Sequence, residues 1–180
     1  MPRLFTGLML PDDISESLAQ LKGGVGGARW VDHTSFHITL RFIGDIDGSM
    51  ARDIADALVD VRFPSFELQL KGINVYGGAN PHALYAGLVE SAELRRLHGV
   101  HERLCQVLGL PPEHRKFLPH VTLARLHNPD PQSLQRYLAA ENLFSSRRFQ
   151  VSHFVLFSAR PSRGGGPYAM EEAYQLEGAL

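Results

Sequence analysis

The sequence predicts an α+β protein, bilobal, with two pseudo-symmetric and mostly antiparallel sheets that face each other across a cleft and carry helices on their outer faces. Two observations favour this class: short strand-like segments joined by turns, and about four segments with apolar residues at helical spacing. A third observation is that the phrase His-aliphatic-Thr-Leu occurs twice, at residues 37–40 and 120–123. Each half of the chain therefore carries one such phrase at a comparable place, which indicates an internal duplication.

Elements of the first half follow from hydrophobic spacing and turn residues. Four segments have the apolar pattern of strands, bounded by turn residues: 3–10, 36–43, 66–76 and 82–89. Two segments have apolar residues at helical spacing: 11–24 and 49–61. The first of these opens with Pro11 and two acids and ends with glycines, as helices commonly do.

The second half repeats this plan. Residues 91–108 form the clearest predicted helix, with four leucines on one stripe, and a shorter helix is predicted over 131–140. Strands are predicted over 119–126, 148–159 and 168–176, with a glycine-rich loop over 160–167. No segment is rich enough in Gly, Pro or Ser to separate independently folding units. We therefore expect residues 1–180 to form a single domain of two intimately fused lobes, one holding residues 37–39 and the other residues 120–122.

Composition and charge limit the classes of function. The chain has 180 residues, 44% of them hydrophobic and 21% charged, which is typical of a soluble globular protein. A formal net charge of −1 gives no global field that would draw the protein onto long nucleic acids or membranes. The apolar N-terminal run is too short for a membrane span. Cys105 is the single cysteine, so no internal disulfide forms and a reducing compartment is expected; we predict a cytoplasmic protein.

The repeated phrase places polar side chains on one face of a strand. Because residues i and i+2 share a face, His37 points the same way as Thr39, and His120 the same way as Thr122. If the two sheets face each other, both pairs converge in one cleft. Two histidines on opposite sides of a substrate suit metal-free phosphodiester hydrolysis, one as general base and one as general acid. The threonine hydroxyls are placed to stabilise charge on phosphate oxygens.

The motifs "HITL" and "HVTL" resemble the two signature motifs of the 2H phosphoesterase superfamily. The surrounding segments "RLFTGLMLP", "HITLRFIGD", "NVYGGANPHALYAGL", "RKFLPHVTLARL" and "FVLFSARPSRGGGPY" are similar to its bacterial RNA 2′,3′-cyclic phosphodiesterase branch, the 2′-5′ RNA ligase family. The similarity runs from about residue 3 to residue 170. A single H-x-T triplet would be weak evidence, whereas two in collinear contexts, each followed by leucine, are a specific signal.

This resemblance implies an activity and a catalytic set. It implies hydrolysis of an RNA-terminal or nucleoside 2′,3′-cyclic phosphate to a 2′-phosphate without metal or organic cofactor, with reversible 2′-5′ ligation of RNA in some members. By motif match the catalytic residues are His37, Thr39, His120 and Thr122. Our working assignment makes His120 the base and His37 the acid, although the sequence does not fix that order. The partners implied are RNA ends or small cyclic nucleotides.

Three further residues are candidates for substrate binding. Arg125 matches the family pattern, but it lies five residues after His120 and so on the opposite face of a regular strand. It reaches the substrate only if the strand ends or bulges before it, and otherwise serves as a structural cation. Arg41 shares the parity of His37 and is expected to reach the cleft. Tyr168 follows the glycine-rich loop and is placed to stack on a base.

Alternative functions remain open at this point. A catalytically silent module that binds nucleotides or RNA ends would use the same cleft, although it has no need of two titrating groups. A metal-dependent hydrolase is the third possibility, because His98 and His101 lie three residues apart on a predicted helix. His101 falls on the leucine stripe, however, which favours a structural role, and no zinc motif is present. The motifs do not identify the natural substrate; we expect a monomer with no obligatory protein partner.

Overall fold

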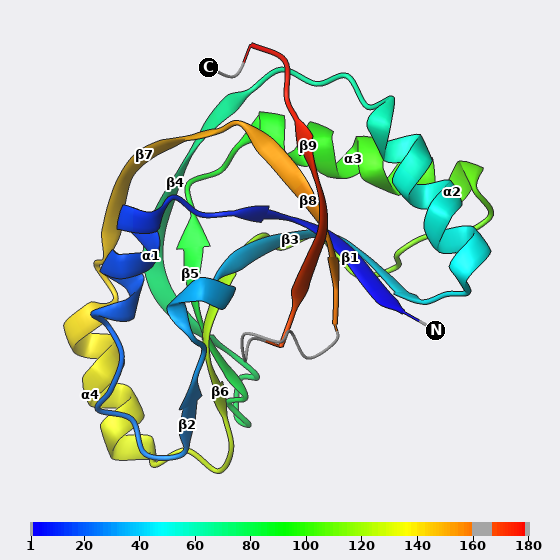
Figure 1. Ribbon diagram of the computed structural model, residues 1–180. Helices are drawn as coiled ribbons and strands as arrows, with labels where there is room; N and C mark the ends of the chain where they lie inside the picture. The colour runs from blue at the N-terminus through cyan, green and yellow to red at the C-terminus, as the bar shows by residue number, and fades with distance from the viewer. Residues whose placement is uncertain (1, 160–166, 179–180) are drawn as a thin grey trace.

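The computed structural model describes residues 2–159 and 167–178, and its strands form two antiparallel sheets (Figure 1). The first sheet has the strand order β3-β1-β8-β9, and the second has the order β2-β6-β5-β4-β7. The strands are β1 (Arg3–Met9), β2 (Ala28–Trp30), β3 (His37–Asp45), β4 (Phe66–Tyr76), β5 (Ala83–Leu88), β6 (Val121–Leu126), β7 (Ser145–Val151), β8 (His153–Ser158) and β9 (Ala169–Gln175). The predicted α+β class with two antiparallel sheets is thereby confirmed.

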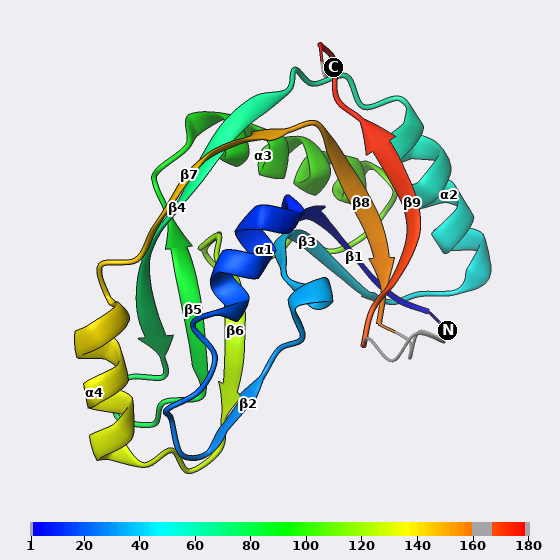
Figure 2. The ribbon, with the colours of Figure 1, turned by 60° about the vertical axis from the view of Figure 1, so that its left-hand side comes forward.

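Helices cover the outer faces of both sheets. They are α1 (Asp12–Ala19), α2 (Gly48–Val59), α3 (Ala92–Val107) and α4 (Pro131–Glu141), with a short 3₁₀ helix η1 (His33–Ser35). Helices α2 and α3 pack against the four-stranded sheet, α3 on β3 and α2 on β9. Helices α1 and α4 pack against the five-stranded sheet, on β7 and β4 (Figures 1 and 2).

One strand from each half of the chain, β4 and β8, pairs with strands of the other half. Apart from short β2 and η1, which lie between α1 and β3, the first half runs β1-α1-β3-α2-β4. The second half runs β5-α3-β6-α4 and ends in β7 and β8. Strand β4 does not join β1 and β3 but pairs with β5 in the other sheet, and β8 in turn pairs with β1. Each sheet therefore contains strands from both halves, so the lobes are interleaved along the sequence.

This pairing divides the segment predicted as one strand over residues 148–159. Strand β7 ends at Val151 beside β4, and β8 begins at His153 beside β1, so Ser152 marks the change of sheet. The predicted first helix is also too long, since α1 ends at Ala19. Strand β2 was not predicted, and residues 160–166 of the predicted loop lie outside the described part of the chain.

One hydrophobic core joins the two sheets. Its fully buried members include Leu8 and Ile38 from the four-stranded sheet and Leu70 and Val121 from the five-stranded sheet. Ile38 and Val121 are the aliphatic residues of the two repeated phrases. Because neighbouring side chains on a strand face opposite ways, burying these two aliphatic side chains in the core turns the motif histidines and threonines toward the other side.

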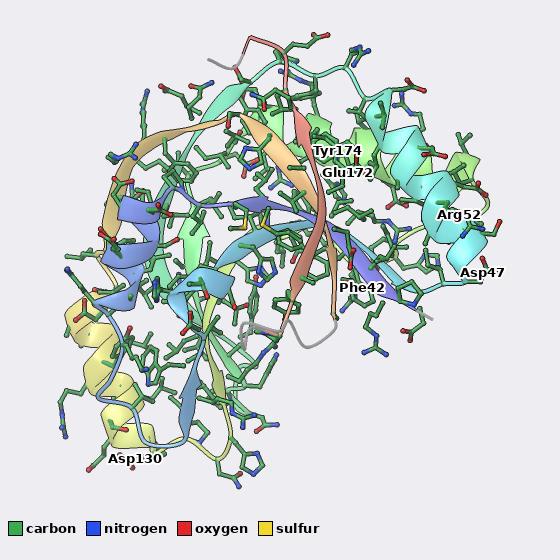
Figure 3. All side chains as sticks on the ribbon, in the orientation of Figure 1. Phe42, Asp47, Arg52, Asp130, Glu172 and Tyr174 are labelled. Carbon is green, nitrogen blue, oxygen red and sulfur yellow. The ribbon has the colours of Figure 1, made fainter. Side chains whose placement is uncertain are left out.

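The repeat also extends into the helices that follow the histidine strands. Asp47 and Asp130 each lie ten residues after their histidine and begin helices α2 and α4 (Figure 3). The Asp47 carboxylate accepts a hydrogen bond from Met50 N at 2.8 Å, and that of Asp130 accepts one from Ser133 N at 3.0 Å. These are N-caps, worth about 1 kcal/mol each, and they fix the start of the helix in both halves.

Candidate active site

A cavity of about 790 Å³ contains the side chains of both repeated phrases. Its lining includes His37 and Thr39 from β3, His120 immediately before β6, and Thr122 within β6. Strand β3 belongs to the four-stranded sheet and β6 to the five-stranded sheet, so the cavity lies where the two sheets meet. The convergence expected of the two polar pairs is therefore present in the structure.

Both imidazole rings are held in the same way. The Nδ1 atom of His37 lies 2.8 Å from the Ser35 carbonyl oxygen, and that of His120 lies 2.7 Å from the Leu118 carbonyl oxygen. A carbonyl oxygen only accepts hydrogen bonds, so Nδ1 must donate in both rings. In the neutral ring Nε2 is then an acceptor, and in the protonated ring it is a donor. Each histidine can therefore serve as base or as acid through Nε2.

A β-bulge in β3 turns Arg41 away from the cavity. Thr39 pairs with Gly7 of β1, but Arg41 pairs with the adjacent Thr6, so Leu40 is an extra residue in the ladder. Leu40 and Arg41 are consequently both buried. The Arg41 guanidinium donates to Glu102 of α3 and, at 2.7 Å, to the Pro111 carbonyl oxygen. The prediction that Arg41 reaches the cleft is wrong, because alternation assumed a strand without a bulge.

The same bulge in β6 turns Arg125 into the cavity. Thr122 pairs with Tyr85 of β5, whereas Ala124 pairs with the adjacent Leu84, so Leu123 is extra. The side-chain alternation is thereby shifted by one residue, and exposed Arg125 lines the cavity together with Thr122. The sequence left two possibilities for Arg125: a cavity position after a bulge or strand end, or a structural role. The structure has a bulge before Arg125, which gives it the cavity position.

The two bulges make Phe42 the counterpart of Arg125. Each residue lies five positions after its histidine and lines the cavity. Phe42 is 41% exposed, which is unusual for a phenylalanine, and projects from β3 (Figure 3). Sequence reasoning did not consider this residue, because in a strand without a bulge Phe42 would share the buried face of Ile38. The repetition itself contained the signal, because a bulge in one strand predicts a bulge in the other.

His37 lies among aromatic rings. The ring centroids of Phe5, Phe157 and Tyr168 are 5.1, 5.6 and 5.2 Å from that of His37. Burial lowers the pKa of His37 below its ordinary 6.5, the Ser35 carbonyl opposes the shift, and the charges of His120 and Arg125 lower the pKa further. Tyr168 lines the cavity, and Phe5 both lines it and packs in a small cluster with Phe157.

His120 has a more polar environment. Tyr76 and Tyr85 stack on each other at 4.1 Å between ring centroids. Both form T-shaped contacts with the imidazole, at 5.0 and 5.5 Å between centroids. The Tyr76 hydroxyl lies 3.3 Å from His120 Nδ1. Burial is the largest cause that lowers the pKa of His120, the Leu118 carbonyl opposes it, and Arg125 adds to the lowering.

The histidines on α3 have structural surroundings. His101 is 1% exposed, its Nδ1 lies 2.8 Å from the Thr6 hydroxyl, and burial lowers its pKa to about 3. His98 stacks on Phe117 at 3.9 Å between ring centroids. In the described part of the chain, no three His, Cys, Asp or Glu side chains form a group that could hold a metal ion. Among the same residues, no helix is long and apolar enough to cross a membrane.

Two histidines and two threonines in one cleft between antiparallel sheets are the arrangement expected of a two-histidine phosphoesterase. The family model of the 2′-5′ RNA ligase superfamily matches residues 10–162. The chain therefore belongs to this superfamily, as its motifs predicted.

Individual relatives agree with this placement. An RNA 2′,3′-cyclic phosphodiesterase from Aquifex aeolicus is 28% identical over 98% of this chain and 98% of that protein. One from Aeropyrum pernix is 39% identical over 53% of this chain and 56% of that protein. The crystal structure of E. coli LigT complexed with 3′-AMP has the same fold, with a TM-score of 0.78 and 22% identity over 98% of this chain and 99% of LigT.

Proposed function

We propose that this protein is an RNA 2′,3′-cyclic phosphodiesterase that acts by two-histidine general acid–base catalysis. The observation that carries the proposal is the matched placement of His37 and His120 in one cavity, each with Nδ1 donated to a backbone carbonyl. Two Nε2 atoms are thereby left free for a substrate between them. Family membership and the names of the relatives support the same reaction class.

The reaction needs one proton taken and one proton given. The neutral histidine accepts a proton from water through Nε2 while the water oxygen attacks phosphorus. The P–O3′ bond breaks, and the protonated histidine donates its Nε2 proton to O3′, leaving a 2′-phosphate and a free 3′-hydroxyl. We keep His120 as the base and His37 as the acid in this scheme. The rings exchange protonation states over the cycle, so proton transfer through solvent restores them.

The remaining cavity residues suit a nucleotide. Thr39 and Thr122 are placed to donate hydrogen bonds to the non-bridging phosphate oxygens, whose charge grows in the transition state. Arg125 supplies a positive charge close enough to lower the pKa of both histidines. Tyr168 and Phe42 offer aromatic surfaces for a nucleobase. The LigT structure with 3′-AMP shows a nucleotide bound to a protein of this fold.

Several finer points belong to the same proposal. We propose that no metal or organic cofactor takes part, and that 2′-5′ ligation is the same P–O3′ cleavage with an RNA 5′-hydroxyl attacking phosphorus in place of water. We also propose a single domain, active as a cytoplasmic monomer, because one chain provides both histidines and contains one cysteine.

The proposal is tested with EDTA-treated protein and a nucleoside 2′,3′-cyclic phosphate, with the product followed by phosphorus NMR. A 2′-phosphate is the expected product, and it would show both the reaction class and independence from metal. A 3′-phosphate would contradict the direction of P–O bond cleavage. Turnover that appears only when a divalent metal is restored would contradict the two-histidine mechanism. Binding without turnover of this substrate or of RNA with a cyclic end would favour a silent binding module.

A further inference from the structure

Two arginines lie side by side on the cavity face of the five-stranded sheet. Arg29 of β2 and Arg125 of β6 are direct partners in the antiparallel ladder, and both side chains are exposed and line the cavity. Directly opposed side chains on one sheet face lie close together, and like charges in that position repel each other. The arrangement costs the folded protein stability unless an anion lies between the two guanidinium groups.

The described residues provide no such anion. Neither arginine forms an ion pair with another residue within 2–159 or 167–178. The partner of Arg125 on its other side is Ala83 of β5, a small side chain that leaves space beside the guanidinium. Asp32 is the only acid among the described residues of the cavity lining, and its carboxylate accepts hydrogen bonds from Thr34 N at 2.9 Å and Thr34 Oγ1 at 2.6 Å.

The arginine pair also extends away from the histidines. The charge of Arg125 lowers the pKa of both histidines, whereas that of Arg29 does not contribute to either shift. Strand β2 is the edge strand of its sheet, so Arg29 is one strand further from the reacting phosphate than Arg125. The pair therefore reaches from the site of chemistry toward the edge of the cavity.

We infer that Arg29, together with Arg125, forms a second anion subsite that binds the 5′-phosphate of the nucleotide whose cyclic phosphate is hydrolysed. The inference rests on the proposed function. In an RNA end this 5′-phosphate is the link to the preceding nucleotide, whereas a free cyclic nucleoside lacks it. Guanidinium groups suit phosphate because their donors form a planar fork that matches its oxygens. The subsite makes the enzyme prefer RNA 3′ ends and 5′-phosphorylated nucleotides over free cyclic nucleosides.

A pair of substrates that differ by one phosphate tests this subsite. Adenosine 2′,3′-cyclic phosphate is compared with the same nucleotide carrying a 5′-phosphate, and the ratio of their kcat/KM values is measured. We expect a ratio of at least about ten in favour of the 5′-phosphorylated substrate, as for one charge-assisted contact. Arg29→Gln should bring this ratio close to one, and Arg29→Lys, which keeps the charge, should restore part of it.

A matched control comes from another exposed arginine. Arg52 lies on helix α2, outside the cavity lining (Figure 3), so Arg52→Gln makes the same change of charge and should leave the ratio as in the wild type. Equal turnover of both nucleotides by the wild type would overturn the subsite and leave the proposed reaction intact. An equal loss on both nucleotides in Arg29→Gln would place Arg29 on the nucleoside and also overturn it. Turnover by the wild type of neither nucleotide nor an RNA with a cyclic end would overturn the proposed function, and the inference with it.

Discussion

The surroundings of His37 and His120 differ, although the two rings are held by the same backbone device. In both, the Nδ1–H group donates a hydrogen bond to the carbonyl oxygen two residues earlier. Both are followed by a threonine, by a leucine that is the extra residue of a bulge, and, five residues after the histidine, by a residue that lines the cavity. His37 lies against Phe5, Phe157 and Tyr168. His120 instead forms T-shaped contacts with two tyrosines, and the hydroxyl of one of them, Tyr76, lies 3.3 Å from its Nδ1. The residues at the fifth position are aromatic Phe42 and cationic Arg125.

This comparison separates what the duplication repeats from what it varies. The repeated parts, which are strand, bulge and carbonyl, set ring orientation, and two matched orientations are what an acid and a base on opposite sides of a phosphate require. The varied parts are the side chains that line the cavity. They put Phe42 and Tyr168 near His37, and Arg29 and Arg125 on the five-stranded sheet with His120, which suits a substrate that carries both a base and phosphates.

Removing either ring should have the largest effect on activity. We expect His37→Ala and His120→Ala each to lower kcat/KM by at least roughly 10²-fold, because each removes a positioned acid or base. Circular dichroism and unfolding curves check that the fold persists. His114→Ala, at an exposed position outside the cavity lining, is the matched control. Near-wild-type turnover in either mutant would show that the two rings do not act as a pair.

Arg41 and Ala124 occupy equivalent positions, each directly after the extra residue of its bulge. Because Arg41 is charged and buried, replacing it should change the stability of the fold. Arg41→Ala should lower the free energy of unfolding by about 3 kcal/mol, because it leaves Glu102 without its buried partner. Urea unfolding measures this loss, and steady-state kinetics on the folded fraction measure KM. A rise in KM with unchanged stability would instead support the substrate-binding role that alternation suggested for this arginine.

Thr39 and Thr122 should contribute to catalysis to a similar extent as each other. We expect Thr39→Val and Thr122→Val each to lower kcat by about tenfold to hundredfold with smaller changes in KM, since the hydroxyl bonds strengthen as charge develops. Ser17→Ala, which removes an exposed hydroxyl on helix α1 outside the cavity lining, is the control. An effect confined to KM would mean that the hydroxyls bind the ground state only.

Gly7 of β1 lies where β3 leaves no room for a side chain. Replacing it has the smallest expected effect of the changes considered, and the effect is on stability. A Cβ atom on Gly7 would lie 2.7 Å from the Ile38 carbonyl oxygen, so Gly7→Ala must push β3 away from β1. We expect a loss of about 1–3 kcal/mol in the free energy of unfolding. Gly99→Ala on helix α3 meets no atom within 4 Å and should instead gain about 0.5–1 kcal/mol. Equal urea midpoints for the two variants would contradict this reading of the β1–β3 contact.

Several features of the fold could be predicted from the sequence, because apolar spacing reports burial directly. Strand β4 has the predicted bounds, and the helices after the histidine strands begin within one residue of the predicted start. The pairing of β4 with β5 and of β8 with β1 could not be predicted. The apolar run that contains β7 and β8 continues across Ser152 although its neighbours change, and three-residue β2 is too short for a periodic pattern.

In the site, alternation placed each histidine beside its threonine but failed beyond them. One extra residue reverses alternation for every later residue of a strand, so Arg41 was placed in the cavity and Phe42 was not. The open question over Arg125 had the same cause. Bulges depend on pairing with a neighbouring strand, which a single sequence does not display. Arg29 was missed because its partner across the sheet is far away in the sequence.

The most direct test of paired acid–base action is the pH dependence of kcat/KM in the wild type and in the two histidine mutants. Activity should rise with pH as the base loses its proton and fall as the acid loses its own. Because burial lowers the pKa of both rings below 6.5, the falling limb should lie at or below that pH and the optimum should be mildly acidic. We predict that His37→Ala removes one limb and His120→Ala the other. Loss of the same limb in both mutants, or a bell that neither mutation changes, would contradict the account.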